Sequence, residues 1–175
     1  MSIIGETVGP RKPYHEKSDA EKVRSNWRKT LNLFRMGEYS VAIIRAATVV
    51  ELGANLAIRN ELIAQRRLPE KFVDRLLILA NGLDGKFKKI ILPIVDGQQN
   101  ETLFTQLVAD IEYINKERNK VVHSGEFKGE RTAKKCIQTA HKVVTTMVAH
   151  YSSSFILENL PDAGETRSNA DGRRS

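Results

Sequence analysis

Apolar residues recur at three- and four-residue intervals along most of this 175-residue chain, the spacing of amphipathic α-helices. A first helix is predicted from Ser18 to Gly37, because Ser18 and Glu21 form the pattern of a capping box. One face of this helix carries Val23, Trp27, Leu31 and Phe34. Nowhere do apolar and polar residues alternate as they would in a half-buried strand, so the pattern predicts an all-α fold.

The second predicted helix, residues 38–66, is apolar on almost every side and rich in small residues, which is typical of a central helix. Glu51, Asn55 and Arg59 follow one another at intervals of four residues and therefore share one face. A carboxylate is costly to bury without a partner. Either Asn55 mediates a contact between Glu51 and Arg59, or Glu51 points at a residue from another helix.

Proline and glycine divide the next part of the chain into shorter segments. A third helix is predicted over residues 68–82. A short segment over residues 84–95 is interrupted by Pro93, and Asp96-Gly97 marks a turn.

The remaining pattern sets the domain boundaries. A last helix is predicted from Thr132 to about Asn159. We therefore expect a flexible arm over residues 1–17 and a single domain, a bundle of four to five main helices, over residues 18–159. The polar residues 160–175 are predicted to form a disordered tail.

The helix predicted over residues 101–123 brings polar side chains onto its inward-facing line. That line runs through Phe104, Leu107, Val108, Ile111 and Ile114. The next position on it is Arg118, where an ordinary solvated charge would not be placed. Asn119 and His123 follow, and Gly125 is predicted to end the helix.

Arg118, Asn119 and His123 form a set of side chains suited to phosphate chemistry. They supply a permanent cation, an amide, and an imidazole that can exchange a proton near neutral pH. Arg118 could stabilise charge on a phosphate, oriented by Glu51, while His123 acts as general acid or base. These roles suit metal-independent RNA cleavage, in which the ribose 2′-OH attacks the adjacent phosphate.

Helical geometry restricts how these side chains could meet. In a regular helix Arg118 and His123 point about 140° apart, whereas Asn119 and His123 share a face. The arginine and the histidine are then expected to reach one phosphate in one of two ways. Either the helix loosens at Val121-Val122, or a second copy of the motif completes the site across a dimer.

Net charge favours a polyanionic partner without proving one. The formal charge is +7 and the isoelectric point is about 9.6, which fits nucleic acid and fits simple solubility equally well. Lys116, Lys120 and Lys128 lie around the motif and are candidate RNA contacts. Glutamates are interleaved with them, so the local excess of positive charge is modest.

Cysteine and histidine usage argues against metal or disulfide chemistry. Cys136 is the single cysteine, so no internal disulfide can form, and its apolar helical position indicates an inert buried thiol. His15, His123, His141 and His150 lack metal-ligand spacing, and we expect neither a metal nor a cofactor.

The same sequence predicts a cytoplasmic protein. We expect no apolar run of membrane-spanning length, and the first residues lack the apolar stretch of a signal peptide. A reduced compartment and no membrane association are therefore predicted.

The pair Arg118-Asn119 followed by His123 is an Rx4–6H motif near the end of the penultimate predicted helix. In an all-α chain this arrangement resembles the HEPN superfamily (higher eukaryotes and prokaryotes nucleotide-binding domains). The early helix AIIRAATVVELGANLAIRNEL, with Glu51 embedded in it, is similar to that family too. The resemblance covers roughly residues 38–155.

The resemblance implies a bundle of four or five helices that usually dimerises, with two motifs lining a cleft between protomers. Many members are endoribonucleases without a metal cofactor, in toxin–antitoxin, abortive-infection or phage-defence systems. Carried over, Arg118 and His123 become catalytic, Asn119 supports the site, and Glu51 is the orienting acid. RNA is the implied partner, and a nucleotidyltransferase-like antitoxin is a second one.

Three functions stay open at this point, because the family also contains inactive members with similar helices. The first is the endoribonuclease. The second is a non-catalytic module that binds RNA or nucleotides, or that pairs with an antitoxin. The third is a dimeric helical scaffold, in which Arg118 is a buried partner of Glu51.

Overall fold

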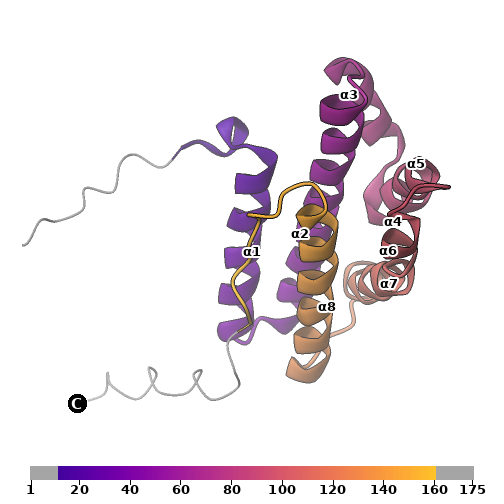
Figure 1. Ribbon diagram of the computed structural model, residues 1–175. Helices are drawn as coiled ribbons and strands as arrows, with labels where there is room; N and C mark the ends of the chain where they lie inside the picture. The colour runs from indigo at the N-terminus through magenta and orange to yellow at the C-terminus, as the bar shows by residue number, and fades with distance from the viewer. Residues whose placement is uncertain (1–11, 161–175) are drawn as a thin grey trace, which may run out of the picture.

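The computed structural model describes residues 12–160, and every regular element in that range is a helix (Figure 1). The elements are η1 (Tyr14–Glu16), α1 (Asp19–Arg35), α2 (Tyr39–Arg59), η2 (Asn60–Gln65), α3 (Glu70–Leu79), α4 (Gly82–Lys86), η3 (Phe87–Ile91), α5 (Leu92–Val95), α6 (Glu101–Thr105), α7 (Val108–Ser124) and α8 (Glu130–Ala149). The predicted all-α helical bundle is confirmed. Most of the predicted arm and tail falls on residues 1–11 and 161–175, which lie outside the described residues.

The first predicted helix is confirmed, together with its cap. Ser18 Oγ accepts a hydrogen bond from the Glu21 N–H at 3.2 Å, and the Glu21 carboxylate accepts from the Ser18 N–H at 2.6 Å. These two bonds form a capping box, which satisfies backbone donors that the first helical turn leaves open. At the other end Gly37 adopts a φ of 79°, a backbone conformation that favours glycine.

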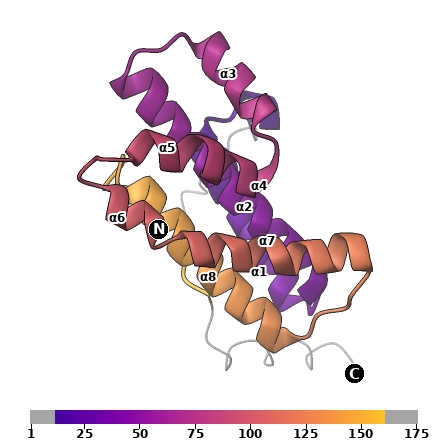
Figure 2. The ribbon, with the colours of Figure 1, turned by 90° about the vertical axis from the view of Figure 1, so that its right-hand side faces the viewer.

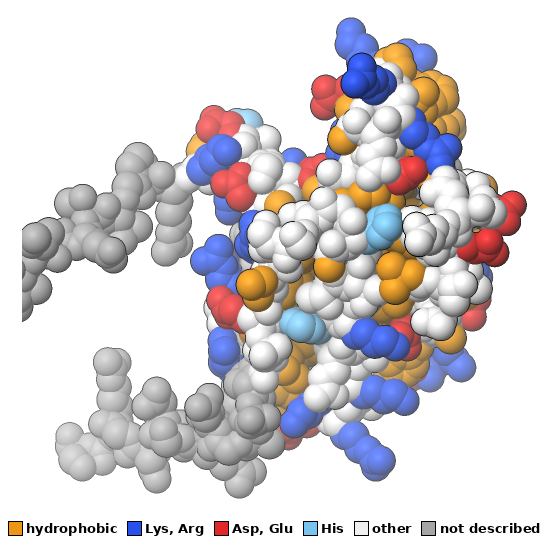
Figure 3. All heavy atoms as spheres, viewed as in Figure 1, with side chains coloured by type: hydrophobic (Ala, Val, Ile, Leu, Met, Phe, Trp, Pro, Cys, Tyr) orange, Lys and Arg blue, Asp and Glu red, His pale blue; other side chains and the backbone are white. Residues whose placement is uncertain are grey.

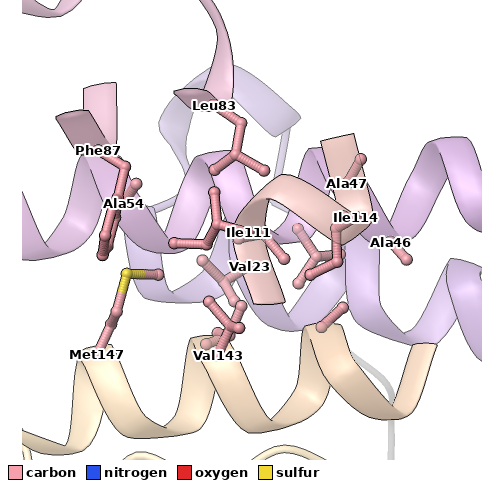
Figure 4. Packing of buried hydrophobic residues seen from close by; sticks show 14 of the residues in the cluster. Val23, Ala46, Ala47, Ala54, Leu83, Phe87, Ile111, Ile114, Val143 and Met147 are labelled. Atoms are coloured by element: carbon pink, nitrogen blue, oxygen red, sulfur yellow. The ribbon is translucent and has the colours of Figure 1, made fainter. Parts of the chain in front are cut away.

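Helix α2 lies at the centre of the bundle and packs against α1, α7 and α8 (Figures 1 and 2). Its close approach to α8 depends on Gly53, since a Cβ atom there would lie 3.3 Å from both methyl groups of Val144. Figure 4 shows the cluster in which these helices meet, with Ala54 of α2, Ile111 of α7 and Met147 of α8 among its buried side chains. The central position predicted for this helix is thus confirmed.

The stretch Tyr39–Gln65, which joins α2 to η2, corrects one expectation from the sequence. Its most apolar 18 residues have a mean hydropathy of 1.7, so by length and composition alone it could cross a membrane. The prediction that no apolar run reaches this length is therefore wrong. Because 56% of those residues are buried inside the protein, the stretch has the character of a core helix.

Helical boundaries in the second half of the chain differ from those predicted. The segment around Pro93 is a continuous helix, in which the π-helical η3 directly precedes α5 and Pro93 occupies the first turn of α5. The helix predicted over residues 101–123 is divided into α6 and α7 at Gln106-Leu107. Helix α8 ends at Ala149, ten residues before the predicted Asn159.

Residues 150–160 lie between α1 and α8 instead of prolonging α8 (Figure 1). Phe155 and Leu157 are buried there. Trp27 of α1 donates a hydrogen bond from Nε1 to the backbone oxygen of Glu158 at 2.8 Å. The imidazole of His141 on α8 lies 3.3 Å from the backbone oxygen of Leu157. The segment therefore packs on the domain through Phe155 and Leu157, which join the hydrophobic core.

Cys136 lies on the buried face of α8, where burial raises the pKa of its thiol to about 12, with a smaller contribution from the Glu117 carboxylate. The thiolate is the reactive form of cysteine. We expect iodoacetamide to leave native Cys136 unmodified at mildly alkaline pH and to label it fully in guanidinium chloride. Mass spectrometry of both samples checks this, and rapid labelling of the native protein would contradict the assigned burial.

Candidate active site

The motif lies at the carboxyl end of α7. The helix stays regular through Ser124 and ends at Gly125, whose φ of 64° is left-handed, as predicted for this glycine. The Glu126 N–H then donates to the backbone oxygen of Lys120 at 3.2 Å, which closes the helix end. The two valines therefore do not loosen the last turns.

Arg118 contacts His123 within one chain. Its Nη1 atom donates to Asn119 Oδ1 at 2.8 Å and lies 3.5 Å from His123 Nε2. Since a guanidinium can only donate, a hydrogen bond at this position requires Nε2 as the acceptor and therefore the ring tautomer with its proton on Nδ1. We expected the two side chains to reach one phosphate only through a loosened helix or a dimer, yet they already lie in contact within one regular helix. The long arginine side chain spans the angle between the two positions.

The inward-facing line of α7 ends at Glu117 and not at Arg118. Ile111, Ile114 and Glu117 are buried in α7, whereas Arg118 is partly exposed. The buried positions step by three residues here, so the line reaches Glu117 before Arg118. This corrects the inward placement that the sequence predicted for the arginine.

Glu117, which is 7% exposed, is held by two lysines. Its carboxylate lies 3.0 Å from Lys128 Nζ and 3.1 Å from Lys120 Nζ. Burial raises the pKa of the Glu117 carboxyl, but hydrogen bonds from Lys128 and Lys120 outweigh burial and bring the net pKa below its ordinary value. Glu117 is therefore a carboxylate that fastens the loop after α7 to the helix.

Lys128, which was predicted to contact RNA, has a mostly buried side chain that is bound to acidic residues of the protein. Its side chain is 10% exposed, and its Nζ atom lies between the carboxylates of Glu126 and Glu117. Hydrogen bonds to Glu126 and then to Glu117 raise the pKa of the Lys128 ammonium. An ammonium that is already held by two carboxylates has little capacity left for a phosphate, which argues against Lys128 as an RNA contact.

A groove with a volume of about 510 Å³ runs between α4 and α7, which lie side by side in Figure 2. The residues that line it are Asp84, Glu112, Asn115, Lys116, Asn119, Lys120, His123 and Ser124. Asn119 and His123 share this face, as predicted, and Lys116 and Lys120 lie on the same surface. The groove therefore brings four of the predicted site residues together, and the contact with His123 places the Arg118 guanidinium at its edge.

Lys88 of η3 neutralises the two acidic side chains of the groove. Its Nζ atom lies 2.7 Å from Glu112 and 3.0 Å from Asp84. The hydrogen bond to Glu112, which has the largest effect, and the one to Asp84 raise the pKa of the Lys88 ammonium. Within residues 12–160 Lys116 makes no ion pair, so its positive charge is available to a ligand in the groove.

Glu51 does not contact Arg118. Its carboxylate lies 2.5 Å from Nζ of Lys86, a buried lysine of α4. Arg59 instead pairs with Asp19 at 3.1 Å and with Asp74. Of the two partners that the sequence left open, the residue from another helix is the one observed. The contact with Arg118 that was predicted for Glu51, both for the orienting role and for the scaffold hypothesis, is therefore wrong.

Charge on the face shown in Figure 3 does not single out a site. On the face shown in Figure 3, lysine and arginine side chains are spread along the edges with acidic side chains between them. In the described part of the chain no three His, Cys, Asp or Glu side chains converge on a position for a metal ion. The arrangement that can do chemistry is the cation–imidazole contact beside the groove. No family model matches this chain, and neither a curated protein nor a solved structure matches it.

Proposed function

We propose that this protein is a metal-independent endoribonuclease of the HEPN type and that RNA lies in the groove between α4 and α7. The observation that supports this most is the position of the Arg118 guanidinium, which contacts both Asn119 and His123 beside the groove. A permanent cation can stabilise the charge of the transition state and a neighbouring imidazole can move the proton, so this pair suits metal-independent phosphate transfer.

The reaction follows from what each group can do. The RNA phosphate accepts hydrogen bonds from Arg118, which frees His123 Nε2 to accept the proton of the ribose 2′-OH. The 2′-oxygen attacks the adjacent phosphorus, and the bond from phosphorus to the 5′-oxygen breaks. The imidazolium then returns its proton to the departing 5′-oxygen. The products carry a 2′,3′-cyclic phosphate and a 5′-hydroxyl, and no proton is gained or lost.

Supporting residues act on the arginine and on the RNA backbone. Asn119 Oδ1 holds one Arg118 nitrogen, which limits the orientations of the guanidinium. Lys116 and Lys120 lie along the groove, where ammonium groups attract phosphates. Binding is therefore proposed to weaken as the salt concentration rises.

The cellular setting of the proposal follows the family resemblance. A cytoplasmic homodimer would bring two motifs to one cleft, and a nucleotidyltransferase-like antitoxin would restrain the activity in a toxin–antitoxin or phage-defence system. Glu51, bound to Lys86, has no part in the proposed step.

Incubation of the purified protein with labelled RNA in EDTA tests the proposal. We expect cleavage products with 2′,3′-cyclic phosphate ends, because no step uses a metal ion. Salt-sensitive RNA binding without cleavage would reject the endoribonuclease and favour the non-catalytic RNA-binding module. If the protein neither binds nor cleaves RNA, the helical scaffold is the function that remains.

A further inference from the structure

We infer that Phe127 is a stacking platform for a base of single-stranded RNA beside the groove, an inference that rests on the proposed function. The Phe127 side chain is 96% exposed, which makes it the most exposed of the large hydrophobic residues among residues 12–160. Water solvates such a ring poorly, and a nucleobase of an unpaired strand is a flat surface that covers it.

The backbone on both sides of Phe127 is fixed. The Glu126 N–H donates to the Lys120 backbone oxygen at 3.2 Å, and the Lys128 N–H donates to Ser40 Oγ at 2.9 Å. The Lys128 side chain adds an ion pair with Glu117 at 3.0 Å. The backbone that carries the ring is therefore fixed next to α7, so a base that stacks on Phe127 has to order only the two side-chain torsions of the ring.

The position of Phe127 connects it to the groove. Glu126, its neighbour in the chain, is hydrogen-bonded to Lys120, and both Lys120 and Ser124 line the groove. Phosphates of a strand in the groove would contact Lys120 and Lys116, while a base beyond Ser124 reaches the ring. Cations that follow the backbone, combined with an aromatic side chain for a base, are the usual elements of single-strand binding.

Other exposed hydrophobic residues lack this combination. Ile78 and Leu79 are 75% and 79% exposed, but they are aliphatic and lie on α3, which contributes no residue to the groove. Ile156 lies in the segment between α1 and α8, which is also outside the groove. These residues therefore provide controls of similar exposure.

The experiment measures the affinity for a single-stranded 2′-O-methyl RNA, which the wild-type protein cannot cleave. Loss of one stacked base by alanine substitution weakens binding by about 1–3 kcal/mol, so Phe127→Ala should raise Kd about 5- to 150-fold. Phe127→Trp should retain the affinity and show fluorescence quenching on RNA addition that the wild type, with the buried Trp27, does not show. Ile78→Ala should bind like the wild type.

The outcomes separate this inference from the proposed function. Absence of RNA binding by the wild type would overturn the proposed function. RNA binding and cleavage that Phe127→Ala leaves unchanged would overturn only the inference about Phe127. A fall in the sedimentation mass of Phe127→Ala would also overturn it, since the ring would then cover a second copy of the chain. Because the ring is so exposed, the unfolding curve of Phe127→Ala should match that of the wild type.

Discussion

Replacing His123 with alanine is expected to abolish most RNA cleavage while leaving the fold intact. The proposed reaction uses this imidazole to accept and return a proton, and such acid–base catalysis contributes about 10²–10⁴ to a rate. The cleavage rate in EDTA should therefore fall by about that factor. His123 is exposed at the end of α7, so the free energy of unfolding should change by less than about 0.5 kcal/mol. Initial cleavage rates and urea unfolding curves measure the two effects.

His15→Ala is the matched control for this experiment. It also removes an exposed imidazole, but His15 lies on η1 and contributes nothing to the groove. We expect His15→Ala to cleave at the wild-type rate. Equal cleavage by His123→Ala and the wild type would reject His123 as the proton acceptor. Equal losses in both variants would indicate a general effect of removing an exposed imidazole and would not assign the proton transfer to His123.

Local sequence signals predicted the helices whose ends are capped locally. Ser18 and Glu21 define the start of α1 by bonds within four residues, and Gly125 defines the end of α7 in the same way. No local capping signal in the sequence marks the end of α8 at Ala149. Tyr151 and Phe155 continue the helical spacing, yet the chain turns away after Ala149 and packs against α1. That choice depends on contacts with residues far away in the sequence.

The partner of Glu51 illustrates what a single helix can reveal. The apolar neighbours of Glu51 in the sequence predicted a cation or a donor, and the structure supplies Lys86, although the buried member of the pair is the lysine and the Glu51 side chain is 36% exposed. Lys86 is 35 residues away in the sequence and reaches Glu51 only because α4 packs on α2. The need for a partner was therefore predictable from the sequence, but the identity of the partner was not.

The sequence predicted which residues of the motif come together, but only partly how their side chains are arranged. Arg118, Asn119 and His123 do come together, but the prediction treated each side chain as pointing along its Cβ direction. An arginine has enough rotatable bonds to bridge the angle between the two faces. Glu117 was missed, although a step of three residues from Ile114 leads directly to it. A carboxylate on a buried line, with lysines nearby, is the signal that could have identified it.

Trp27→Ala is expected to cause a larger loss of stability than any change at the site. Trp27 is 1% exposed and is among the largest fully buried side chains of the domain. Truncating a buried tryptophan to alanine lowers the free energy of unfolding by about 3–5 kcal/mol, since the cavity fills only partly. Domains of this kind are stable by about 5–15 kcal/mol in total. Urea unfolding followed by circular dichroism measures the loss.

Trp27→Phe separates packing from hydrogen bonding. Phenylalanine keeps most of the buried ring but cannot donate to the Glu158 backbone oxygen, so the loss should be smaller, about 1–2 kcal/mol. Hydrogen exchange should also become faster in residues 150–160, because that bond joins the segment to α1. Unchanged exchange in Trp27→Phe would show that the buried Phe155 and Leu157 hold the segment without the bond. Unchanged stability in Trp27→Ala would contradict the position of the indole in the core.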